Sequence, residues 1–524
     1  KNIAINIGNR KKAIDTAILN LEPNEILLVA GKGHEATQNY GNKIVNFSDK
    51  KIIKKIIKKR KYFFKKNYWA SFIFQKAFGN TKLKEINYKD VSISSKNMKK
   101  DNLFFAIKGK NTDGHKFTRD AIKRGASLVV VSKIVKEIPK SKYIKVKNTL
   151  SSLNNLAKVS RENSSACIIG ITGSAGKTTL KNLTSFILKS FGKVHQSPHS
   201  YNNKFGVPLS LSNLKSDTEY GVFEIGMDKK GEIDNLSKIV KPEIAVITNI
   251  SEAHHKNFKS IKDIAKAKSE IINNISEGGN IILNKDDKFF NFLSNKAKKR
   301  GIKITSFALK KKADIYLLKV KQIKSYYEVI VKVKNKTVSF MTKNCTDSFV
   351  SNMLACIAIL YILDLNLNLI SKKFSDFVLP YGRGDIKVVK KFGKKFKFID
   401  ESYNANPLSM LSAIKNLHYY KGEKNLKKII FLGDMLELGK KSRKLHKSLS
   451  TKINRSNIDK VFVYGNYIKE TFNALSANKK GKIFNSFKEA NNHLGKIIHN
   501  NDLLMVKGSN ATGLNQFSKN IKKG

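Results

Sequence analysis

The chain has 524 residues, enough for three or four domains, and 41% of them are hydrophobic, so it can bury substantial cores. Its formal net charge of +61 would suit a nucleic acid or an anionic membrane, but only nine of its 101 basic residues are arginine. Because arginine dominates base recognition and the lysines are spread over the whole length, we expect no nucleic-acid partner. The three cysteines show no metal-ligand spacing and no signal peptide is visible, which favours a cytoplasmic protein.

The first 68 residues divide into two expected segments. Residues 1–49 contain "EILLVAGKGHE", which predicts a strand that enters a glycine-rich loop. Residues 50–68 contain "KKIIKKIIKKRKYFFKK", whose apolar pairs recur every four residues, as in a basic amphipathic helix. Such a helix could lie on an anionic membrane, although a solvated helix that links two domains is the simpler interpretation.

The longest apolar run, "MLACIAILYIL" from Met353, is too short to span a bilayer and predicts a buried helix. We therefore expect no stable membrane insertion and at most weak contact with a membrane surface.

Three further segments follow, and their patterns predict an α/β protein. Residues 69–152 alternate short strands and turns with one helix, "TRDAIKRGAS". Residues 153–378 alternate strands and helices, which predicts a parallel sheet, while 313–341 has the alternation of antiparallel ribbons. In residues 379–524, strands run into Gly- or Asn-bearing loops in "FKFIDESYNANP", "IIFLGDMLELG", "VFVYGN" and "LLMVKGSN". Loops at the carboxyl ends of parallel strands are where such sheets bind ligands.

The sequence "GITGSAGKTTLKN", from Gly170, has the order strand, glycine loop, lysine, threonine and helix of a phosphate-binding loop. Its glycines would let backbone N–H groups converge on phosphate oxygens at a helix N-terminus. Lys177 can reach the β- and γ-phosphates, and the Thr178 hydroxyl can bind Mg²⁺. Ile171 stands where the common motif has its first glycine, so a chance match of turn glycines is the alternative. The predicted apolar face of the helix is Leu180, Leu183, Ile187 and Phe191.

Three downstream residues could complete a metal site beside a triphosphate. Glu224 ends the strand in "GVFEIG", His254 follows the strand in "AVITNISEAHH", and Lys268 lies on the helix of "DIAKAKSEII". Carboxylate and imidazole groups can hold Mg²⁺ in such a place. Taken singly, each residue also fits an exposed strand end, a loop histidine or a solvated lysine.

Together these segments resemble the Mur ligase family, ATP-dependent enzymes that add amino acids to the peptide stem of the bacterial cell-wall precursor. The resemblance covers roughly residues 75–524 and is strongest for the branch that joins D-alanyl-D-alanine to UDP-N-acetylmuramoyl-tripeptide. "LFFAIKGKNTDGHKF" and "YNNKFGVPLSL" resemble substrate-binding segments of that branch, and "TNISEAH" and "AKAKSE" resemble the family's metal and lysine segments. "IDESYNANP" and "FLGDMLELG" are the most specific to the branch.

The resemblance implies three working domains and a set of residue roles. The domains are a UDP-substrate-binding α/β domain at 69–152, a central phosphate-loop ATPase domain at 153–378 and a Rossmann-like ligase domain at 379–524. The implied catalytic residues are Lys177, Lys268, His254 and Arg383. The implied ATP contacts are Gly173, Ser174, Ala175, Gly176, Lys177, Thr178, Thr179, Asn352, Arg383 and Glu401. The implied ligands of two Mg²⁺ ions are Thr178, Glu224, His254 and Lys268, with Lys268 as a carbamate. The implied substrate contacts are Asp113, Gly114, His115, Asn202, Asn203, Tyr403, Asn404 and Asn406.

Some segments depart from this pattern. The family's "DSR" reads "SSK" at Ser94–Lys96, and Lys204 replaces an acid in "NNKFG", both on the substrate side. Residues 1–49 resemble instead the C-terminal end of the branch that adds the third stem residue, with Gly31, His34 and Glu35 in its "GKGHE" motif. We therefore expect an incomplete N-terminal α/β fragment before the ligase.

The implied reaction transfers the γ-phosphoryl group of ATP to the tripeptide carboxylate, and the amine of D-Ala-D-Ala then displaces phosphate. A monomer is expected. Other functions stay open from the sequence: a ligase for another amino acid, a nucleic-acid-dependent NTPase, or a non-catalytic cell-wall scaffold.

Overall fold

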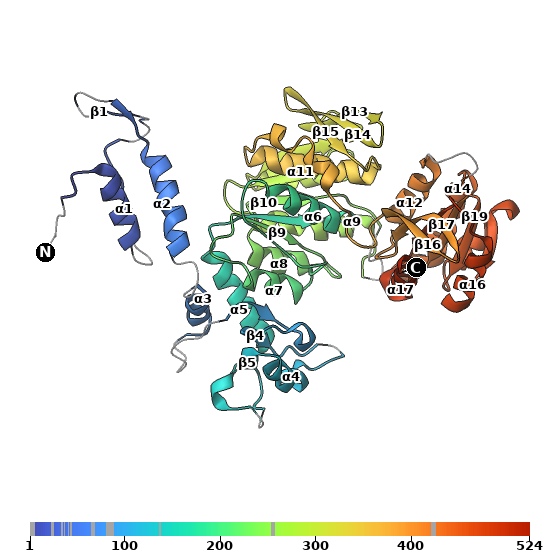
Figure 1. The fold of residues 1–524 in the computed structure, drawn as a ribbon, viewed down its shortest axis with the longest axis horizontal. Helices are drawn as coiled ribbons and strands as arrows, with labels where there is room; N and C mark the ends of the chain where they lie inside the picture. The colour runs from blue at the N-terminus through green and yellow to red at the C-terminus, as the bar shows by residue number, and fades with distance from the viewer. Residues whose placement is uncertain are drawn as a thin grey trace. The chain divides into compact units, whose positions relative to one another are not determined.

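The protein is described by a computed structural model over residues 6–21, 26–32, 35, 37–39, 41, 44–63, 69–79, 88–109, 111–135, 138–252, 257–420 and 426–523. The chain forms two compact units, which are treated separately below. The first unit is Lys1–Ala166 with Ser212–Thr218, and the second is Cys167–Leu211 with Glu219–Gly524. Figure 1 labels their helices and strands along the chain.

The first unit begins with a pair of helices, α1 (Arg10–Asn20) and α2 (Asp49–Phe63). A short antiparallel ribbon of β1 (Thr37–Asn39) and β2 (Ile44–Asn46) lies between them in sequence. A small apolar cluster joins the helices, and its members are Ile14, Ile18 and Ile56, with Leu27, Val29, Ile52 and Ile53 partly buried. The guanidinium of Arg10 adds an ion pair of 2.6 Å to Asp49 and a hydrogen bond of 2.8 Å to the carbonyl of Ala30.

One of two expectations for this part needs correction. The strand predicted in "EILLVAGKGHE" is wrong for its described residues 26–30, which carry no regular secondary structure. Ile26 and Leu28 are 95% and 85% exposed, because an apolar run becomes a strand only where another strand pairs with it. The predicted basic helix forms as α2, and its apolar residues pack on α1, so its lysine side is the side exposed to solvent. Residues 64–68 lie outside the described part of the chain.

The rest of the first unit contains a parallel sheet in the order β3-β4-β5-β6. Its strands are β3 (Val91–Ser92), β4 (Asn102–Phe105), β5 (Ala126–Val131) and β6 (Tyr143–Lys145). Its helices are α3 (Trp69–Phe78), η1 (Ser95–Asn97), η2 (Gly114–Phe117), α4 (Thr118–Lys123), η3 (Lys140–Lys142) and α5 (Thr149–Glu162). Phe104, Val129 and Val131 anchor a core under α4. The expected boundary between 152 and 153 falls inside α5, all of which belongs to this unit.

The second unit begins with a nine-stranded sheet in the order β15-β14-β13-β12-β11-β10-β7-β9-β8. Its parallel strands are β7 (Cys167–Thr172), β8 (Val194–Gln196), β9 (Tyr220–Glu224), β10 (Ile244–Ile247), β11 (Asn280–Asn284), β12 (Lys303–Ala308) and β13 (Ile315–Ile323). The antiparallel ribbon predicted at 313–341 is confirmed, since β14 (Tyr326–Val333) pairs antiparallel with β13 and with β15 (Lys336–Thr342).

Most helices of this part connect the parallel strands, while the last three follow β15. In chain order, the helices are α6 (Lys177–Leu188), α7 (Gly206–Ser212), α8 (Glu232–Val240), α9 (Ile261–Lys268), η4 (Ser269–Asn274), α10 (Phe290–Lys299), α11 (Asp347–Ile362), η5 (Leu367–Ile370) and η6 (Lys373–Asp376). The order of the strands reverses around β7, because the chain reaches β8 and β9 on one side of it and β10 and β11 on the other. The carboxyl end of β7 is therefore a topological switch point, the usual ligand site of an open α/β sheet.

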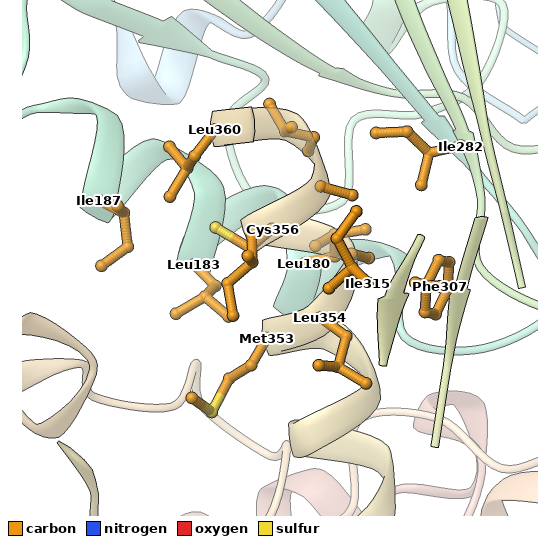
Figure 2. Close-up of a cluster of buried hydrophobic side chains, with 14 of the residues drawn as sticks. Leu180, Leu183, Ile187, Ile282, Phe307, Ile315, Met353, Leu354, Cys356 and Leu360 are labelled. Atoms are coloured by element: carbon orange, nitrogen blue, oxygen red, sulfur yellow. The ribbon is translucent and has the colours of Figure 1, made fainter. Parts of the chain in front are cut away.

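Helix α11 lies at the centre of the largest core (Figure 2). The buried helix predicted around Met353 is thus confirmed. Figure 2 shows its side chains meeting those of α6 and of the strands; the labelled residues are Leu180, Leu183, Ile187, Ile282, Phe307, Ile315, Met353, Leu354, Cys356 and Leu360. Phe191 packs on this core but not from the helix as predicted, because α6 ends at Leu188 and a turn follows.

A second sheet in this unit has the order β16-β17-β21-β18-β19-β20. Its strands are β16 (Asp385–Lys391), β17 (Lys394–Glu401), β18 (Lys428–Gly433), β19 (Lys460–Tyr464), β20 (Lys480–Ile483) and β21 (Leu503–Lys507), and only β16 is antiparallel to its neighbour. Its helices are α12 (Pro407–Tyr419), η7 (Gly439–Lys441), α13 (Ser442–Lys447), α14 (Leu449–Asn454), α15 (Lys469–Asn473), η8 (Ala477–Lys479), α16 (Phe487–Ile497), η9 (Asn510–Thr512) and α17 (Leu514–Lys522). Separate apolar cores include alternate residues of the same strands, such as Ile430 and Phe431, so both faces of this sheet are covered.

Candidate functional site

The glycine loop after β7 leaves no room for other residues at its two key positions. Gly173 and Gly176 have φ angles of +145° and +84°, a region that side chains disfavour. A Cβ at Gly173 would overlap the Thr248 hydroxyl, and one at Gly176 would lie 2.9 Å from Asn352 Oδ1. These glycines are therefore required by close approach as well as by the turn.

The loop is held by the segment that follows β10. The N–H of Ser174 donates to Asn249 O at 2.9 Å, and the N–H of Ala175 donates to Asn249 Oδ1 at 3.0 Å. Thr248 returns a hydrogen bond of 2.6 Å to the carbonyl of Ala175. Since the first N–H groups of a helix have no intrahelical acceptor, those of Lys177, Thr178 and Thr179 at the start of α6 remain to meet an anion.

Half-buried positive charge surrounds this helix start. Lys177 donates from Nζ to Gly173 O at 2.9 Å, and Arg383 Nη2 donates to Thr178 Oγ1 at 3.2 Å. Burial lowers the pKa of Lys177, which nearby Glu224 partly offsets and Arg383 reinforces. Burial also lowers the pKa of Arg383, although Glu224 opposes it. Such an excess of half-buried cations favours an anionic ligand, because the ligand would relieve the cost of their desolvation.

Hard oxygen donors lie beside the cations. Thr178 Oγ1 donates to Glu224 Oε2 at 2.8 Å, and Asn202 Nδ2 donates to Glu224 Oε1 at 2.7 Å. Glu224 is only 1% exposed. A hydroxyl and a carboxylate suit Mg²⁺, yet no cluster of three or more His, Cys, Asp or Glu suited to a metal occurs among the described residues. An ion here would have to share its coordination with ligand oxygens and water. His254 lies outside the described residues.

Two other predicted residues are buried in this segment. Lys268, at the end of α9, is 1% exposed, and burial together with nearby Lys177 holds its pKa well below the ordinary value. Burial therefore disfavours the charged form of Lys268. Asn352 is 6% exposed on α11 and faces the glycine loop at Gly176.

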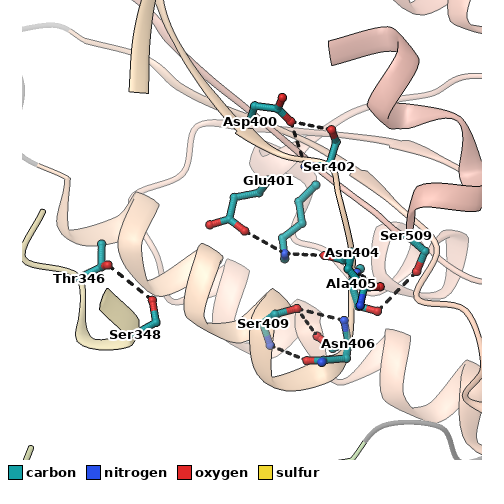
Figure 3. A network of polar contacts seen from close by, with 11 residues as sticks. Thr346, Ser348, Asp400, Glu401, Ser402, Asn404, Ala405, Asn406, Ser409 and Ser509 are labelled. Atoms are coloured by element: carbon teal, nitrogen blue, oxygen red, sulfur yellow. Dashed lines mark hydrogen bonds and ion pairs between the residues drawn. The ribbon is translucent and has the colours of Figure 1, made fainter. Parts of the chain in front are cut away.

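Two lysines from other elements bind the end of β17 and the loop after it, and Figure 3 shows the polar contacts of Asp400, Glu401 and this loop. Lys507, only 1% exposed at the end of β21, donates from Nζ to Glu401 Oε2 and to Asn404 O, both at 3.1 Å. Asp400 Oδ1 accepts from the N–H and the hydroxyl of Ser402 at 3.0 and 2.6 Å. Its Oδ2 forms an ion pair of 3.0 Å with Lys522, outside hydrogen-bond geometry.

The loop's three predicted residues differ in their contacts: Asn406 reaches the phosphate loop, Tyr403 contacts residues beside it, and Asn404 does neither. Tyr403 donates its hydroxyl to Ser200 Oγ at 3.0 Å, and its ring lies 4.4 Å from the guanidinium of Arg383. Asn406 donates from Nδ2 to Ser174 O at 3.3 Å and caps α12 with its side-chain oxygen. Asn404 instead accepts from its neighbour's N–H with its side chain and so shapes its own loop.

The motif "FLGDMLELG" has a local structural role. Asp434 accepts hydrogen bonds from the N–H groups of Asn466, Tyr467 and Ile468 at 2.9, 3.0 and 2.7 Å. A Cβ at Gly465 would lie 2.6 Å from this carboxylate. Asp434 therefore joins the motif to the "YGN" turn after β19.

The predicted substrate residues Asp113, Gly114 and His115 belong to the first unit, where they shape their own turn. Asp113 Oδ1 accepts from the N–H of His115 at 3.0 Å and lies 2.6 Å from His115 Nδ1. Ser132 N–H donates to His115 Nε2 at 2.9 Å, so the imidazole proton sits on Nδ1. Burial would raise the pKa of Asp113, but hydrogen bonds from His115 and Lys133 hold it below its ordinary value. A Cβ at Gly114 would lie 2.7 Å from Ile107 N.

Asn203 has a similar local role in the second unit. Its Oδ1 accepts from the N–H groups of Phe205 and Gly206 at 3.1 and 3.0 Å, which orders the chain entering α7. Asn202 is the member of the pair whose side chain reaches Glu224.

Three residues of the site were missed by the sequence reasoning. Lys181 follows Lys177 by one helical turn and is fully buried, a spacing that was visible in "GKTTLK". Ser200 lies 3.2 Å from Thr178 Oγ1 and directly precedes "YNNKFG". Lys507 was visible as the lysine that ends an apolar strand, but its pairing with Glu401 had no signal in the sequence.

Comparison with known proteins shows which family the chain resembles. Family models describe residues 87–161 as "Mur ligase family, catalytic domain", 171–360 as "Mur ligase middle domain" and 386–510 as "Mur ligase, glutamate ligase domain". A UDP-N-acetylmuramoyl-tripeptide–D-alanyl-D-alanine ligase from Rickettsia prowazekii is 34% identical over 450 residues, which cover 86% of this chain and 98% of the relative. One from Bacillus subtilis is 31% identical over 439 residues, covering 82% and 92%.

Solved structures agree with the sequence comparison. MurF from Acinetobacter baumannii aligns with a TM-score of 0.75 and 25% identity over 87% of this chain and 99% of its own. MurF ligase from Thermotoga maritima in complex with ADP shares the fold, with a TM-score of 0.71 and 24% identity over 85% and 100% of the two chains. With matching family models in every part from residue 87 to 510 and relatives matched over nearly their whole length, the chain belongs to the Mur ligase family.

Proposed function

We propose that this chain is an ATP-dependent ligase that joins D-alanyl-D-alanine to UDP-N-acetylmuramoyl-tripeptide. The relatives that it matches over nearly their whole length carry that name. The observation that carries the chemistry is the group of Lys177, Arg383, Thr178 and Glu224 around the start of α6, in which the two cations are half-buried and the two oxygen donors are buried. This group is suited to a triphosphate, because it presents cations and free helix N–H groups to one point.

The reaction proceeds in two displacements. A carboxylate oxygen of the tripeptide attacks the γ-phosphorus of ATP, and ADP leaves, which produces an acyl phosphate. The amine of D-Ala-D-Ala then attacks the acyl carbon, phosphate leaves from the tetrahedral intermediate, and the nitrogen loses a proton. Lys177 and Arg383 offset the negative charge of the transferred group, so the protein contributes mainly positioning and charge neutralisation.

Mg²⁺ fits the donors of this site. Thr178 Oγ1 and Glu224 would hold one ion between the protein and the phosphates, and His254 with Lys268 would hold a second. Such ions neutralise phosphate charge and orient the transferred group when they are bound. The buried pair at 2.8 Å between Thr178 and Glu224 supports the first position.

Lys268 is proposed to carry a carbamate. A neutral amine can attack CO₂ and lose a proton, which yields an anionic group with two oxygens that suits a hard cation. The burial of Lys268 and its depressed pKa support this proposal, because an ordinary lysine would be a cation at neutral pH.

The remaining roles complete the proposal. Asn352 and Glu401 contact the nucleotide. Residues 69–166, 167–378 and 379–524 act as substrate, ATPase and ligase domains, with the first boundary moved from 152 to the end of the first unit. The substrate contacts proposed are Asp113, Gly114, His115, Asn202, Asn203, Tyr403, Asn404 and Asn406. No helix among the described residues has the length and apolarity to cross a membrane. We further propose that the protein is a cytoplasmic monomer. Light scattering on the purified protein would measure its mass and so test the monomeric state.

The test is phosphate release from ATP with UDP-N-acetylmuramoyl-tripeptide, measured with and without D-Ala-D-Ala. We expect steady release and a pentapeptide product only when all three substrates are present. Stimulation by DNA or RNA in place of these substrates would instead indicate a nucleic-acid-dependent NTPase. Turnover with a different amino acid alone would indicate another branch of the family, and no turnover with any substrate would indicate a scaffold.

A further inference from the structure

Lys181 is a fully buried cation that none of the steps above uses. It lies on α6 one turn after Lys177, and its exposed fraction is 0%. Lysine is almost never fully buried unless its charge is paired or hydrogen-bonded. Here the ammonium donates to the carbonyl of Ser197 at 2.7 Å and to the carbonyl of His199. Burial lowers the pKa of Lys181, and nearby Glu224 partly offsets that effect.

The two carbonyls belong to the 197–202 segment, defined as residues 197–202 of the connection between β8 and α7. This segment contacts both oxygen donors of the candidate Mg²⁺ position. Ser200 Oγ lies 3.2 Å from Thr178 Oγ1, and Asn202 Nδ2 donates to Glu224 Oε1 at 2.7 Å. Ser197 Oγ accepts from the N–H of Glu224 at 3.0 Å. The conformation of the segment therefore sets where Thr178 and Glu224 point.

The same segment contains an unfavourable backbone conformation. His199 has a φ of +45°, in the left-handed region that residues other than glycine rarely adopt. Such conformations cost about 1–3 kcal/mol and persist only where the surroundings impose them. The carbonyl of His199 is one of the two groups that Lys181 binds, so the buried ammonium is placed to impose this turn.

We propose that Lys181 is a positioning residue that fixes the 197–202 segment against α6, so that Thr178 and Glu224 are held ready for Mg²⁺ and ATP. The inference rests on the proposed function insofar as Mg²⁺–ATP is the ligand. Lys181 acts through Ser200 and Asn202. Its loss misplaces the metal ligands while the apolar face of α6 stays in the core.

The test replaces Lys181 by methionine, which keeps the length of the side chain and removes its donors. We expect the Lys181→Met protein to fold and to lose most of the rise in melting temperature that Mg²⁺–ATP gives the wild type. We also expect kcat to fall by about 10²-fold, as for other small displacements of reacting groups. The Mg²⁺ concentration for half activity should rise, while the KM for D-Ala-D-Ala stays unchanged.

Lys428→Met is the matched control. Lys428 is also buried, at 6% exposure, and donates to the carbonyl of His418 at 2.8 Å, but it lies at the start of β18 and away from the glycine loop. It should lower stability without changing the Mg²⁺ dependence. A Mg²⁺ dependence that shifts equally in both variants would mean that Lys181 is only a structural residue and would overturn the proposal.

Two further outcomes decide the inference. If Lys181→Met does not fold, Lys181→Gln, which keeps an amide donor group but not the charge, should show a smaller loss of the same kind. Wild-type Mg²⁺–ATP stabilisation in a folded Lys181→Met or Lys181→Gln protein contradicts the proposal. The stabilisation measurement needs no stem peptide, so a wild-type protein that binds Mg²⁺–ATP but makes no pentapeptide would refute the proposed substrates and leave this inference testable.

Discussion

Helices α6 and α2 both contain lysines, but the surroundings of these lysines differ. In α6, Lys181 is fully buried and Lys177 is half-buried, and both bind backbone carbonyls of loops beside the helix. In α2, the lysines with described side chains are exposed, and these are Lys50, Lys51, Lys54 and Lys55. Because the chain has a net charge of +61, the presence of a lysine is only a weak indication of a functional site, whereas the burial of its ammonium group is a strong one.

The surroundings of the two helices explain this difference. Leu180, Leu183 and Ile187 of α6 belong to an extensive core with α11 and the parallel strands. The apolar side of α2 meets only the small cluster around Ile14 and Ile18 of α1. A large core can offset the cost of burying a lysine, whereas the charged group that α2 buries is the carboxylate of Asp49, which is paired with Arg10.

The largest expected effect is the loss of Lys177. Lys177→Ala should lower kcat by at least about 10³-fold, because the ammonium neutralises the charge that moves during phosphoryl transfer. Phosphate release with all three substrates measures this effect, and circular dichroism checks the fold. Lys189, exposed at the end of the same helix, provides the control, since Lys189→Ala should keep its rate. A near-normal rate in Lys177→Ala would contradict the mechanism.

A nearly equal effect is expected at Lys268. Lys268→Ala should be almost inactive, because its carbamate oxygens would be lost, and short carboxylic acids added to the assay should restore part of the rate. Lys268→Arg keeps a cation but cannot form the carbamate, so it should also be inactive. Full activity of Lys268→Arg would show that no carbamate is required.

A moderate effect is expected at Lys507, a buried lysine on the second sheet. Lys507→Met leaves Glu401 and the carbonyl of Asn404 without their shared donor, which should reduce the free energy of unfolding by about 1–3 kcal/mol. Urea denaturation measures the loss. The double variant Lys507→Met with Glu401→Gln should lose less than the sum of the single variants, and strict additivity would argue against coupling through this ion pair.

A smaller, local effect is expected in acid at the α1–α2 pair. The hydrogen bonds from Arg10 hold the pKa of Asp49 below its ordinary value of 3.8. A depressed carboxyl pKa contributes stability that is present above the unfolded value and is lost as pH falls through the folded one. The protection of α1 amides from hydrogen exchange, relative to the free-peptide rate at the same pH, should therefore fall below about pH 4. Asp49→Asn should show the lower protection already at neutral pH, and equal protection in both proteins would contradict a role for the pair.

The smallest effect is expected from removing the N-terminal part altogether. A chain that begins at Lys66 should fold and keep its rate of pentapeptide synthesis, because the matching family models begin at residue 87. The double substitution Lys51→Gln with Lys55→Gln should likewise leave the rate unchanged, since both lysines are exposed. Activity that falls in proportion to lost folding would make this part a working piece of the ligase and would refute its interpretation as a fragment of another branch.

The sequence by itself determined the features that depend on neighbouring residues. The succession of strand, glycine loop and helix at Cys167–Leu188, the buried helix around Met353 and the ribbon at 313–341 each follow from local periodicity and turn residues, and the structure has all of them. Resemblance to the family added the candidate residues, and of these Thr178, Glu224 and Asn202 lie within hydrogen-bonding distance along one chain of contacts.

Only the tertiary structure decided which charged groups are desolvated and what they bind. The apolar segment at 26–30 does not form a strand, because a strand needs a second strand to pair with it. The local sequence pattern does not say whether such a pairing strand is present. Lys181 and Lys507 differ from the other lysines through carbonyls and carboxylates that are 16 to 106 residues away in the chain. The physical reason is that the burial and pairing of a charged side chain depend on residues far away in the sequence. These contacts form only when the sheets assemble.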